Sequence, residues 1–312
     1  MSITRFPEFT QIITPDGKTF DLDGLQSKWI LSEEGLGLPQ IDYITRSGPF
    51  QHGETVIDYR LKPRIIQISI GQKARTRFDY WDFRKELLDT IRPNRTSLAT
   101  FSPFTLRKRL PNGSLRDINV FIERGPIFQG RDLKHWSETT IEEVLRFVAP
   151  DPTFFDPTPI IELFSVTNIS HWVLPFAFGI NDDLLFGFGA ETTVTTTNTG
   201  TWLSYPDICL TGPLSDVIIT NVTTGEMLNF VGNIASGYAV TISLQYGNKT
   251  VTGSDGANLI GRMSDDSDIA TFHIEVDPIA VGGVNDITIS TQIGVIGESN
   301  VEITYNPRYK GI

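Results

Sequence analysis

A short proline-rich stretch near the middle of the chain separates two segments of different charge. The stretch covers residues 147–159, FVAPDPTFFDPTP, with four prolines in thirteen residues. Residues 1–150 carry 22 basic and 19 acidic side chains, a net charge of +3, whereas residues 151–312 carry 4 and 18, a net charge of −14. Proline fixes φ and lacks an N–H, so the stretch is expected to be a stiff, extended connector. The chain is therefore predicted to form two domains, 1–150 and 151–312, joined at the junction 147–159.

Composition excludes several classes of protein. Each predicted domain is long enough to bury its own core, and the single cysteine, Cys209, excludes an intrachain disulfide. The N-terminus has no basic cluster followed by an apolar run, and no segment reaches the roughly 18 apolar residues of a membrane span. We therefore expect a protein made in a cytoplasm and not inserted into a membrane. The net charge of −11 argues against sequence-specific nucleic-acid binding, which needs clustered Lys and Arg.

The first 150 residues have the pattern of strands with one helix. Turn residues at 15–17, Pro-Asp-Gly, and at 111–114, Pro-Asn-Gly-Ser, each lie between β-rich runs and predict two hairpins. Residues 77–91 predict an amphipathic helix that ends before Pro93. Its expected buried face consists of Phe78, Trp81, Leu87, Leu88 and Ile91. The run 136–148 fits a helix or a strand, and we predict a strand because it is rich in β-branched residues and an extended connector follows.

Beyond residue 159 the sequence has no stretch of helical period. Short β-rich runs recur with Gly, Asn, Asp or Ser between them, at 163–166, 192–197, 207–210, 216–221, 238–244, 249–251, 269–276, 286–291 and 301–305. Regular short strands with such turns predict an antiparallel β-sandwich. The predicted fold class is therefore mainly β, with a β-barrel or sandwich carrying one α-helix in the first domain and an antiparallel β-sandwich in the second.

Motifs for catalysis or cofactor binding are missing from the sequence. It contains no G-x-x-x-x-G-K-[ST], G-x-S-x-G, H-E-x-x-H or C-x-x-C motif, and its four histidines have no metal-ligand spacing. We expect no cofactor and no enzymatic activity. A hydrolase with two carboxylates brought together by the fold stays open, because their separation is not visible in a sequence.

Two further patterns suggest ligand sites. Asp265, Asp266 and Asp268 could ligate calcium, but the run lacks the glycine and distal glutamate of an EF-hand loop, so a solvated loop is the favoured interpretation. Trp172 and Trp202 could stack on a sugar ring, although burial is the more common fate of tryptophan in a β-sandwich. Both sites are kept as alternatives.

The order of features along the chain resembles the distal tail proteins (Dit) of long-tailed bacteriophages. Three stretches carry this resemblance: residues 35–70 followed by 79–93, the crossing at 147–157 with its Ala-Pro-Asp-Pro core, and a C-terminal series. That series consists of Asn198-Thr199-Gly200, residues 205–210, Gly212-Pro213, residues 221–225, residues 248–251, Gly256-Ala257-Asn258 and residues 282–285. Together these stretches cover most of the chain. The sequence departs from the family at 241–244, Thr-Ile-Ser-Leu, where an aspartate often occurs, and it lacks the residues of sugar-binding galectins.

The resemblance implies a structural virion protein at the tip of the phage tail. It implies six copies in a ring that joins the tail tube to tail-fibre or receptor-binding proteins, assembled in the host cytoplasm. It also implies a tail-tube-like, ring-forming first domain and a galectin-like second domain. Ring contacts between copies need head-to-tail surfaces, and the mixed charges of Arg75, Arg77, Asp79 and Asp82 make them candidates. The alternative function is a carbohydrate-binding β-sandwich that acts in host-surface adhesion.

Overall fold

The chain divides into two compact units. The computed structural model describes residues 8–23, 28–93, 102–126, 140–165, 171–173, 185–187, 190–294 and 299–312. Unit 1 comprises Met1–Pro157 together with Tyr309–Ile312, and unit 2 comprises Thr158–Arg308. The last four residues therefore belong to unit 1. A division at the single junction 147–159 places them in the second domain instead. Among the described residues, no helix has the length and apolar character to cross a membrane.

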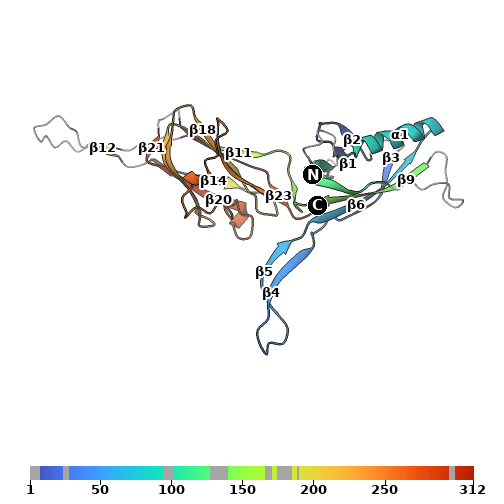
Figure 1. The fold of residues 1–312 in the computed structure, drawn as a ribbon, viewed down its shortest axis with the longest axis horizontal. Coiled ribbons are helices and arrows are strands. Elements are labelled where there is room, and N and C mark those ends of the chain that lie inside the picture. The colour runs from blue at the N-terminus through green and yellow to red at the C-terminus, as the bar shows by residue number, and fades with distance from the viewer. Residues whose placement is uncertain are drawn as a thin grey trace, which may run out of the picture. The chain divides into compact units, whose positions relative to one another are not determined.

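Unit 1 is built on an antiparallel sheet. The strands run in the order β2-β1-β7-β8-β9-β6-β3, and β10 pairs with β8 and β23 (Figure 1). Their bounds are β1 Phe9–Ile13, β2 Thr19–Asp21, β3 Lys28–Glu34, β6 Arg64–Lys73, β7 Phe104–Arg109, β8 Leu115–Arg124, β9 Thr140–Ala149, β10 Phe154–Phe155 and β23 Arg308–Tyr309. Both predicted hairpins are confirmed, β1–β2 and β7–β8, and the ambiguous run forms strand β9. Residues 131–139 lie outside the described part.

Helix α1, Arg77–Thr90, packs one face onto the core of unit 1. Phe83, Leu87 and Ile91 recur every four residues and are at most 6% exposed. The sequence-based face was wrong for Phe78, Trp81 and Leu88, which are exposed at 83%, 51% and 46%. At 100° per residue these three side chains lie about 140–160° around the helix from Phe83, although Leu88 is only about 60° from Ile91. The helix therefore has two apolar stripes, and the sequence pattern alone does not decide which one is buried.

A buried arginine joins distant segments of unit 1. Arg64, at the start of β6, is 2% exposed. Its Nε donates to the carbonyl of Pro152 (2.7 Å), its Nη1 to those of Gly35 (2.6 Å) and Gly37, and its Nη2 to that of Lys310 (2.5 Å). The guanidinium also lies over the ring of Phe154, 4.8 Å from its centroid. Burial lowers the pKa of Arg64 to about 10, so the group stays charged at neutral pH. This arginine clasp holds the loop before β4 (Ile41–Arg46), the junction and the C-terminus against β6.

A buried carboxyl predicts that unit 1 loses stability as the pH rises. Glu143 in β9 is 7% exposed and pairs with Ile70 of β6, and burial raises its pKa to about 7, with Arg84 acting in the opposite direction. The pKa in the folded state lies above the ordinary 4.5. The stabilising contribution is therefore complete below that value and is lost as the pH rises through about 7. We expect a loss on the order of 3 kcal/mol between pH 5 and pH 8.

The measurement is hydrogen exchange of β6 and β9 peptides at both pH values, in the wild type and in Glu143→Gln. The variant cannot ionise at this position, so its exchange free energy should change less with pH than that of the wild type. Glu142→Gln, at the exposed neighbouring position, is the matched control and should behave as the wild type. Equal pH profiles for wild type and Glu143→Gln would refute the assignment.

Unit 2 is a sandwich of two antiparallel sheets. The first has the order β11-β22-β15-β18-β19 and the second β14-β20-β16-β17, with β21 beside β16. The bounds are β11 Ile160–Ser165, β14 Ala190–Thr197, β15 Asp207–Thr211, β16 Leu214–Asn221, β17 Glu226–Ile234, β18 Ala239–Gln245, β19 Asn248–Gly253, β20 Val284–Thr291, β21 Ile293–Gly294 and β22 Asn300–Tyr305. Strands β12 His171–Val173 and β13 Leu185–Gly187 pair separately, and two 3₁₀ turns cover Ile260–Arg262 and Val281–Gly283. Side chains of both five-stranded sheets form one core, which confirms a mainly β fold.

Two strand predictions in unit 2 were wrong. Strand β17 was missed, and the predicted strand 269–276 is an irregular segment that forms only an isolated bridge, between Ser204 and Ile274. Phe272 and Ile274 are fully buried, as a strand pattern requires, but side chains bind the backbone around them. Three amides do so: Asn221 donates to the carbonyl of His273 (2.9 Å), Asn198 to that of Ile274 (3.0 Å) and Asn285 to that of Glu275 (2.9 Å). These contacts replace a strand ladder.

Candidate functional site

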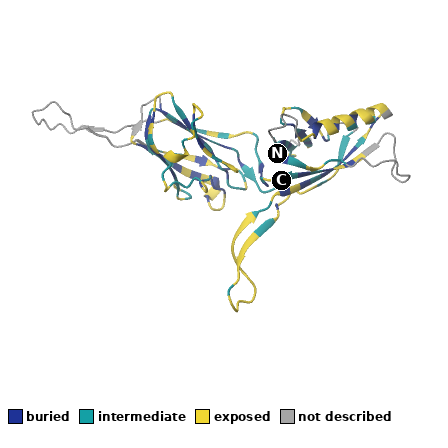
Figure 2. Cartoon of the chain, viewed as in Figure 1, coloured by how far each residue is buried: buried dark blue, intermediate teal, exposed yellow. Residues whose placement is uncertain are grey.

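The strands β4, Ile41–Arg46, and β5, Thr55–Leu61, form a two-stranded hairpin arm of unit 1. Figure 1 shows the hairpin arm projecting from the sheet of this unit, and Figure 2 shows that most of it is exposed. At its base Asp42 binds Arg60 (2.7 Å) and Lys62 (3.5 Å), and the hydrogen bond from Arg60 lowers the pKa of Asp42. A two-stranded ribbon without a covering layer is marginally stable in water. The hairpin arm is therefore a segment that a partner would stabilise.

One face of the hairpin arm is aromatic. Tyr43 and Tyr59 are direct cross-strand partners, so their side chains lie on the same face of the ribbon, and they are 58% and 50% exposed. Other large apolar side chains on the hairpin arm are also exposed: Ile44, Phe50, Val56 and Ile57. Clustered exposed apolar side chains mark protein interaction sites. Two open strand edges add unpaired backbone groups to this surface.

The four predicted ring-contact residues lie at or near the start of α1, with different roles. Arg75 and Asp82 are exposed, and the side chain of Arg77 lies outside the described part. Asp79 forms a capping box: its Oδ2 accepts from the backbone N–H of Thr76 (3.0 Å), while its own N–H donates to the Thr76 hydroxyl (3.2 Å). Asp79 therefore has a structural role in starting the helix.

The outer stripe of α1, which consists of Phe78, Trp81 and Leu88, is a second exposed apolar surface of unit 1. Arg84 lies over the ring of Trp81, 5.0 Å from its centroid, and Tyr80 meets the same ring edge-on at 5.8 Å. These contacts fix a large aromatic side chain that is 51% exposed. The sequence pattern placed this stripe in the core, and the signal that could have corrected the prediction is the Phe83-Leu87-Ile91 spacing.

The two proposed sugar-stacking tryptophans lie in different elements of unit 2. Trp202 is half-buried, and its backbone N–H donates to the carbonyl of Arg308 (3.0 Å) in an isolated bridge. Trp172 lies in β12, and its side chain is outside the described part of the chain. Sugar stacking by Trp172 or Trp202 therefore stays an alternative.

The acidic run at 265–268 is an exposed turn in which one carboxylate has a structural contact. Asp268 Oδ2 accepts from the backbone N–H of Met227 (2.9 Å), while Asp265 and Asp266 are exposed. Within the residues that the structure describes, no group of three or more His, Cys, Asp or Glu side chains is arranged to hold a metal ion. The run is an exposed turn joined to β17 by the contact of Asp268.

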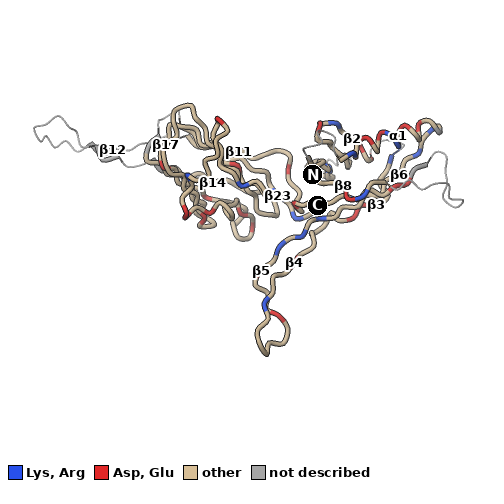
Figure 3. Tube along the Cα trace, viewed as in Figure 1, with Lys and Arg blue, Asp and Glu red and all other residues tan. Residues whose placement is uncertain are grey.

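The charge difference along the sequence is visible in three dimensions. Figure 3 shows both basic and acidic residues along unit 1 and its hairpin arm, and mainly acidic ones among the charged residues of unit 2. Unit 2, residues 158–308, contains 3 basic and 16 acidic residues. A net charge of this size keeps a surface soluble and disfavours anionic partners.

Comparisons with known proteins give a match at the level of structure. No family model matches the sequence, and no curated protein matches it. The crystal structure of the Dit protein of phage SPP1, described as a paradigm of the hub adsorption apparatus in phages that infect Gram-positive bacteria, matches with a TM-score of 0.59. The match covers 96% of this chain and 98% of that chain at 12% identity. The baseplate of phage P2 in its activated conformation with Ca matches 96% and 98% of the two chains, with a TM-score of 0.48 and 11% identity. From the first match, the chain has the fold of a phage distal tail (Dit) protein over nearly its whole length.

Proposed function

We propose that this chain is a structural protein of a phage tail tip, the hub that joins the tail tube to the host-recognition apparatus. The single observation that supports it best is the match to the SPP1 hub protein over 96% of this chain, which includes both units. In this role the protein contacts other virion proteins and catalyses no reaction. Its partners are the tail tube protein and tail-fibre or receptor-binding proteins.

The proposal includes a ring of six copies built by unit 1. A closed ring needs two different surfaces on each copy, which meet head to tail. Unit 1 offers two exposed apolar surfaces, the aromatic face of the hairpin arm and the outer stripe of α1. In this ring the aromatic face of the hairpin arm of one copy contacts the outer stripe of α1 of the next copy. The charged rim of the contact consists of Arg75, Arg77, Asp79 and Asp82. Unit 2, proposed to be galectin-like, carries the contacts with host-recognition proteins.

Removal of the two arm tyrosines is expected to prevent assembly. The wild type alone should have a mass near six times 34.8 kDa by light scattering, or it should assemble into a larger complex once tail tube protein is added. Tyr43→Ser with Tyr59→Ser should weaken each contact at least tenfold, since truncation of one central aromatic commonly costs about 2 kcal/mol. The double variant should be monomeric with an unchanged circular dichroism spectrum, because neither tyrosine belongs to the core.

The matched control is Tyr246→Ser, which removes an aromatic side chain that is 62% exposed in unit 2. It should assemble as the wild type does. A wild type that is monomeric under both conditions would refute the ring. A double variant that still forms the ring would refute the role of the hairpin arm and leave the ring intact.

A further inference from the structure

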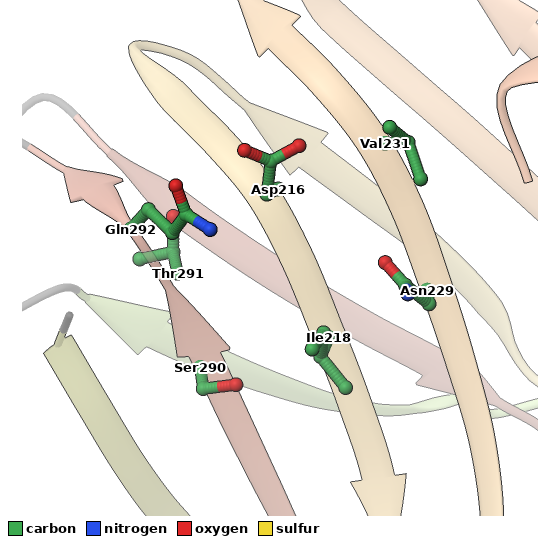
Figure 4. A pocket seen from close by; sticks show the side chains of 7 residues that line it. All are labelled: Asp216, Ile218, Asn229, Val231, Ser290, Thr291 and Gln292. Atoms are coloured by element: carbon green, nitrogen blue, oxygen red, sulfur yellow. The ribbon is translucent and has the colours of Figure 1, made fainter. Parts of the chain in front are cut away.

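The sheet β14-β20-β16-β17 of unit 2 carries an open hollow of about 480 Å³. Its lining residues are Asp216, Ile218, Asn229, Val231, Ser290, Thr291 and Gln292. Figure 4 shows that they come from the neighbouring strands β16 and β17 and from the end of β20. Their neighbours Val217, Phe230 and Ile289 belong to the core. Because side chains alternate across a sheet, the lining residues of β16 and β17 and Ser290 lie on the face turned away from the core, whereas Thr291 is 4% exposed.

An irregularity in the pairing of two strands places a carboxylate at this hollow. The register of β16 and β17 shifts between Ser215 and Val217, so Asp216 has no direct partner. Asp216 has φ 47°, a left-handed conformation that is rare for residues other than glycine. Its Oδ1 accepts from the backbone N–H of Gly232 (2.8 Å) and its Oδ2 from the hydroxyl of Ser215 (3.1 Å). Bulges re-aim side chains, and a strained backbone conformation of this kind is often found at functional sites.

The hollow offers unused hydrogen-bonding capacity. An ionised carboxylate has about four lone-pair positions, and those of Asp216 hold two hydrogen bonds from the chain. The side chains of Asn229, Ser290 and Gln292 form no hydrogen bond with the described part of the chain. Two amides, a hydroxyl and a carboxylate thus surround the aliphatic side chains of Ile218 and Val231. Few, convergent polar groups beside apolar surface are typical of small-ligand sites.

The chemistry of the lining selects a class of ligand. The seven residues include one carboxylate and no cation, and the unit around them has 3 basic and 16 acidic residues. Anionic ligands are therefore disfavoured. A ligand with many hydroxyls and an apolar C–H face would satisfy both the polar groups and the two aliphatic side chains. We propose that this hollow binds a neutral saccharide, independently of ring assembly and of Trp172 and Trp202.

The test is saturation-transfer NMR followed by calorimetry on the full chain. The probes are neutral hexasaccharides of glucose, galactose, mannose and N-acetylglucosamine, and a sulfated hexasaccharide as the anionic probe. At least one neutral probe should bind, and the sulfated one should not. Asn229→Ala with Gln292→Ala should weaken that binding at least tenfold, because both amides are offered to the ligand and neither supports the fold.

Thr193→Ala is the matched control. Its hydroxyl bonds to that of Thr288 on the same sheet (3.0 Å), and neither residue lines the hollow, so binding should stay unchanged. No binding of any neutral probe, binding of the sulfated probe alone, or equal affinity of the wild type and the double variant would each overturn the proposal. None of these outcomes depends on the oligomeric state.

Discussion

Replacing Arg64 with methionine is expected to destabilise unit 1 by about 3–5 kcal/mol, because hydrogen bonds from a charged donor contribute about 1.5–3 kcal/mol each and the substitution removes several of them. Arg64 donates to four backbone carbonyls that lie far apart in the sequence, those of Gly35, Gly37, Pro152 and Lys310. Methionine has a similar length but no donor. All four carbonyls would lose this partner, and the hydrogen bond to Pro152 is buried while the other three are part-buried. A buried acceptor without a partner costs about 1–3 kcal/mol.

Lysine should rescue only part of this loss. Its ammonium keeps the charge but lacks the planar fork that reaches carbonyls in several directions. We expect the free energy of unfolding to be highest for the wild type, lower for Arg64→Lys and lowest for Arg64→Met. Since small domains are stable by about 5–15 kcal/mol, the methionine variant could approach the unfolding threshold of unit 1.

The measurement is native-state hydrogen exchange, which reports each unit separately. Exchange should accelerate in β6 and in residues 309–312, because the C-terminus loses its contact through the carbonyl of Lys310. Arg60→Met is the matched control: its side chain is 72% exposed, so we expect a change within about 0.5 kcal/mol. An Arg64→Met protein with wild-type exchange in unit 1 would show that the clasp does not stabilise the fold.

The second large effect is expected at Asn285 in unit 2. Its side-chain amide is fully buried and uses all of its hydrogen-bonding capacity. Its Nδ2 donates to the carbonyls of Glu275 (2.9 Å) and Gly283 (2.9 Å), and its Oδ1 accepts from Glu275 N (2.9 Å) and Asn221 Nδ2 (3.2 Å). Asn285→Ala removes the partner of two donors, Glu275 N and Asn221 Nδ2. It also removes the partner of two acceptors, the carbonyls of Glu275 and Gly283. We expect a loss of about 3–4 kcal/mol, most of it from the unpaired groups.

Thermal unfolding and hydrogen exchange of residues 268–283 measure this effect. The segment has no strand ladder, so loss of the amide should expose its backbone before the sheets open. Asn233→Ala, at an exposed position of β17, is the control and should change stability by less than about 0.5 kcal/mol. Equal stability of Asn285→Ala and the wild type would contradict the role given to this network.

The sequence predicts the turns and the helix of this fold better than it predicts the long-range contacts around them. The turn at 15–17, the turn at 111–114 and the helix at 77–91 have strong local signals, and all three are confirmed. The segment 269–276 shows where local pattern fails. It alternates as a strand does, but Asn198, Asn221 and Asn285, distant in sequence, bind the backbone that a neighbouring strand would pair with. A long-range contact of this kind leaves no periodic signal.

The candidate surfaces were less predictable than the fold. Strands β4 and β5 form the hairpin arm, but residue alternation in a sequence does not distinguish a strand within a sheet from one in an isolated arm. For α1, two apolar stripes compete, and only packing against the sheet shows that Phe83 is buried while Trp81 is exposed. The hollow at Asp216 depends on a register shift between two strands. Gly232, with φ 102°, lies at this shift, but one glycine in a strand that was not predicted does not locate it.

Electron microscopy of the purified full chain tests the central claim most directly, that this protein works by fitting against copies of itself. Negatively stained particles, alone or mixed with tail tube protein, should average to closed six-fold rings with a central opening. Particles that remain single two-unit molecules in both samples would contradict the account.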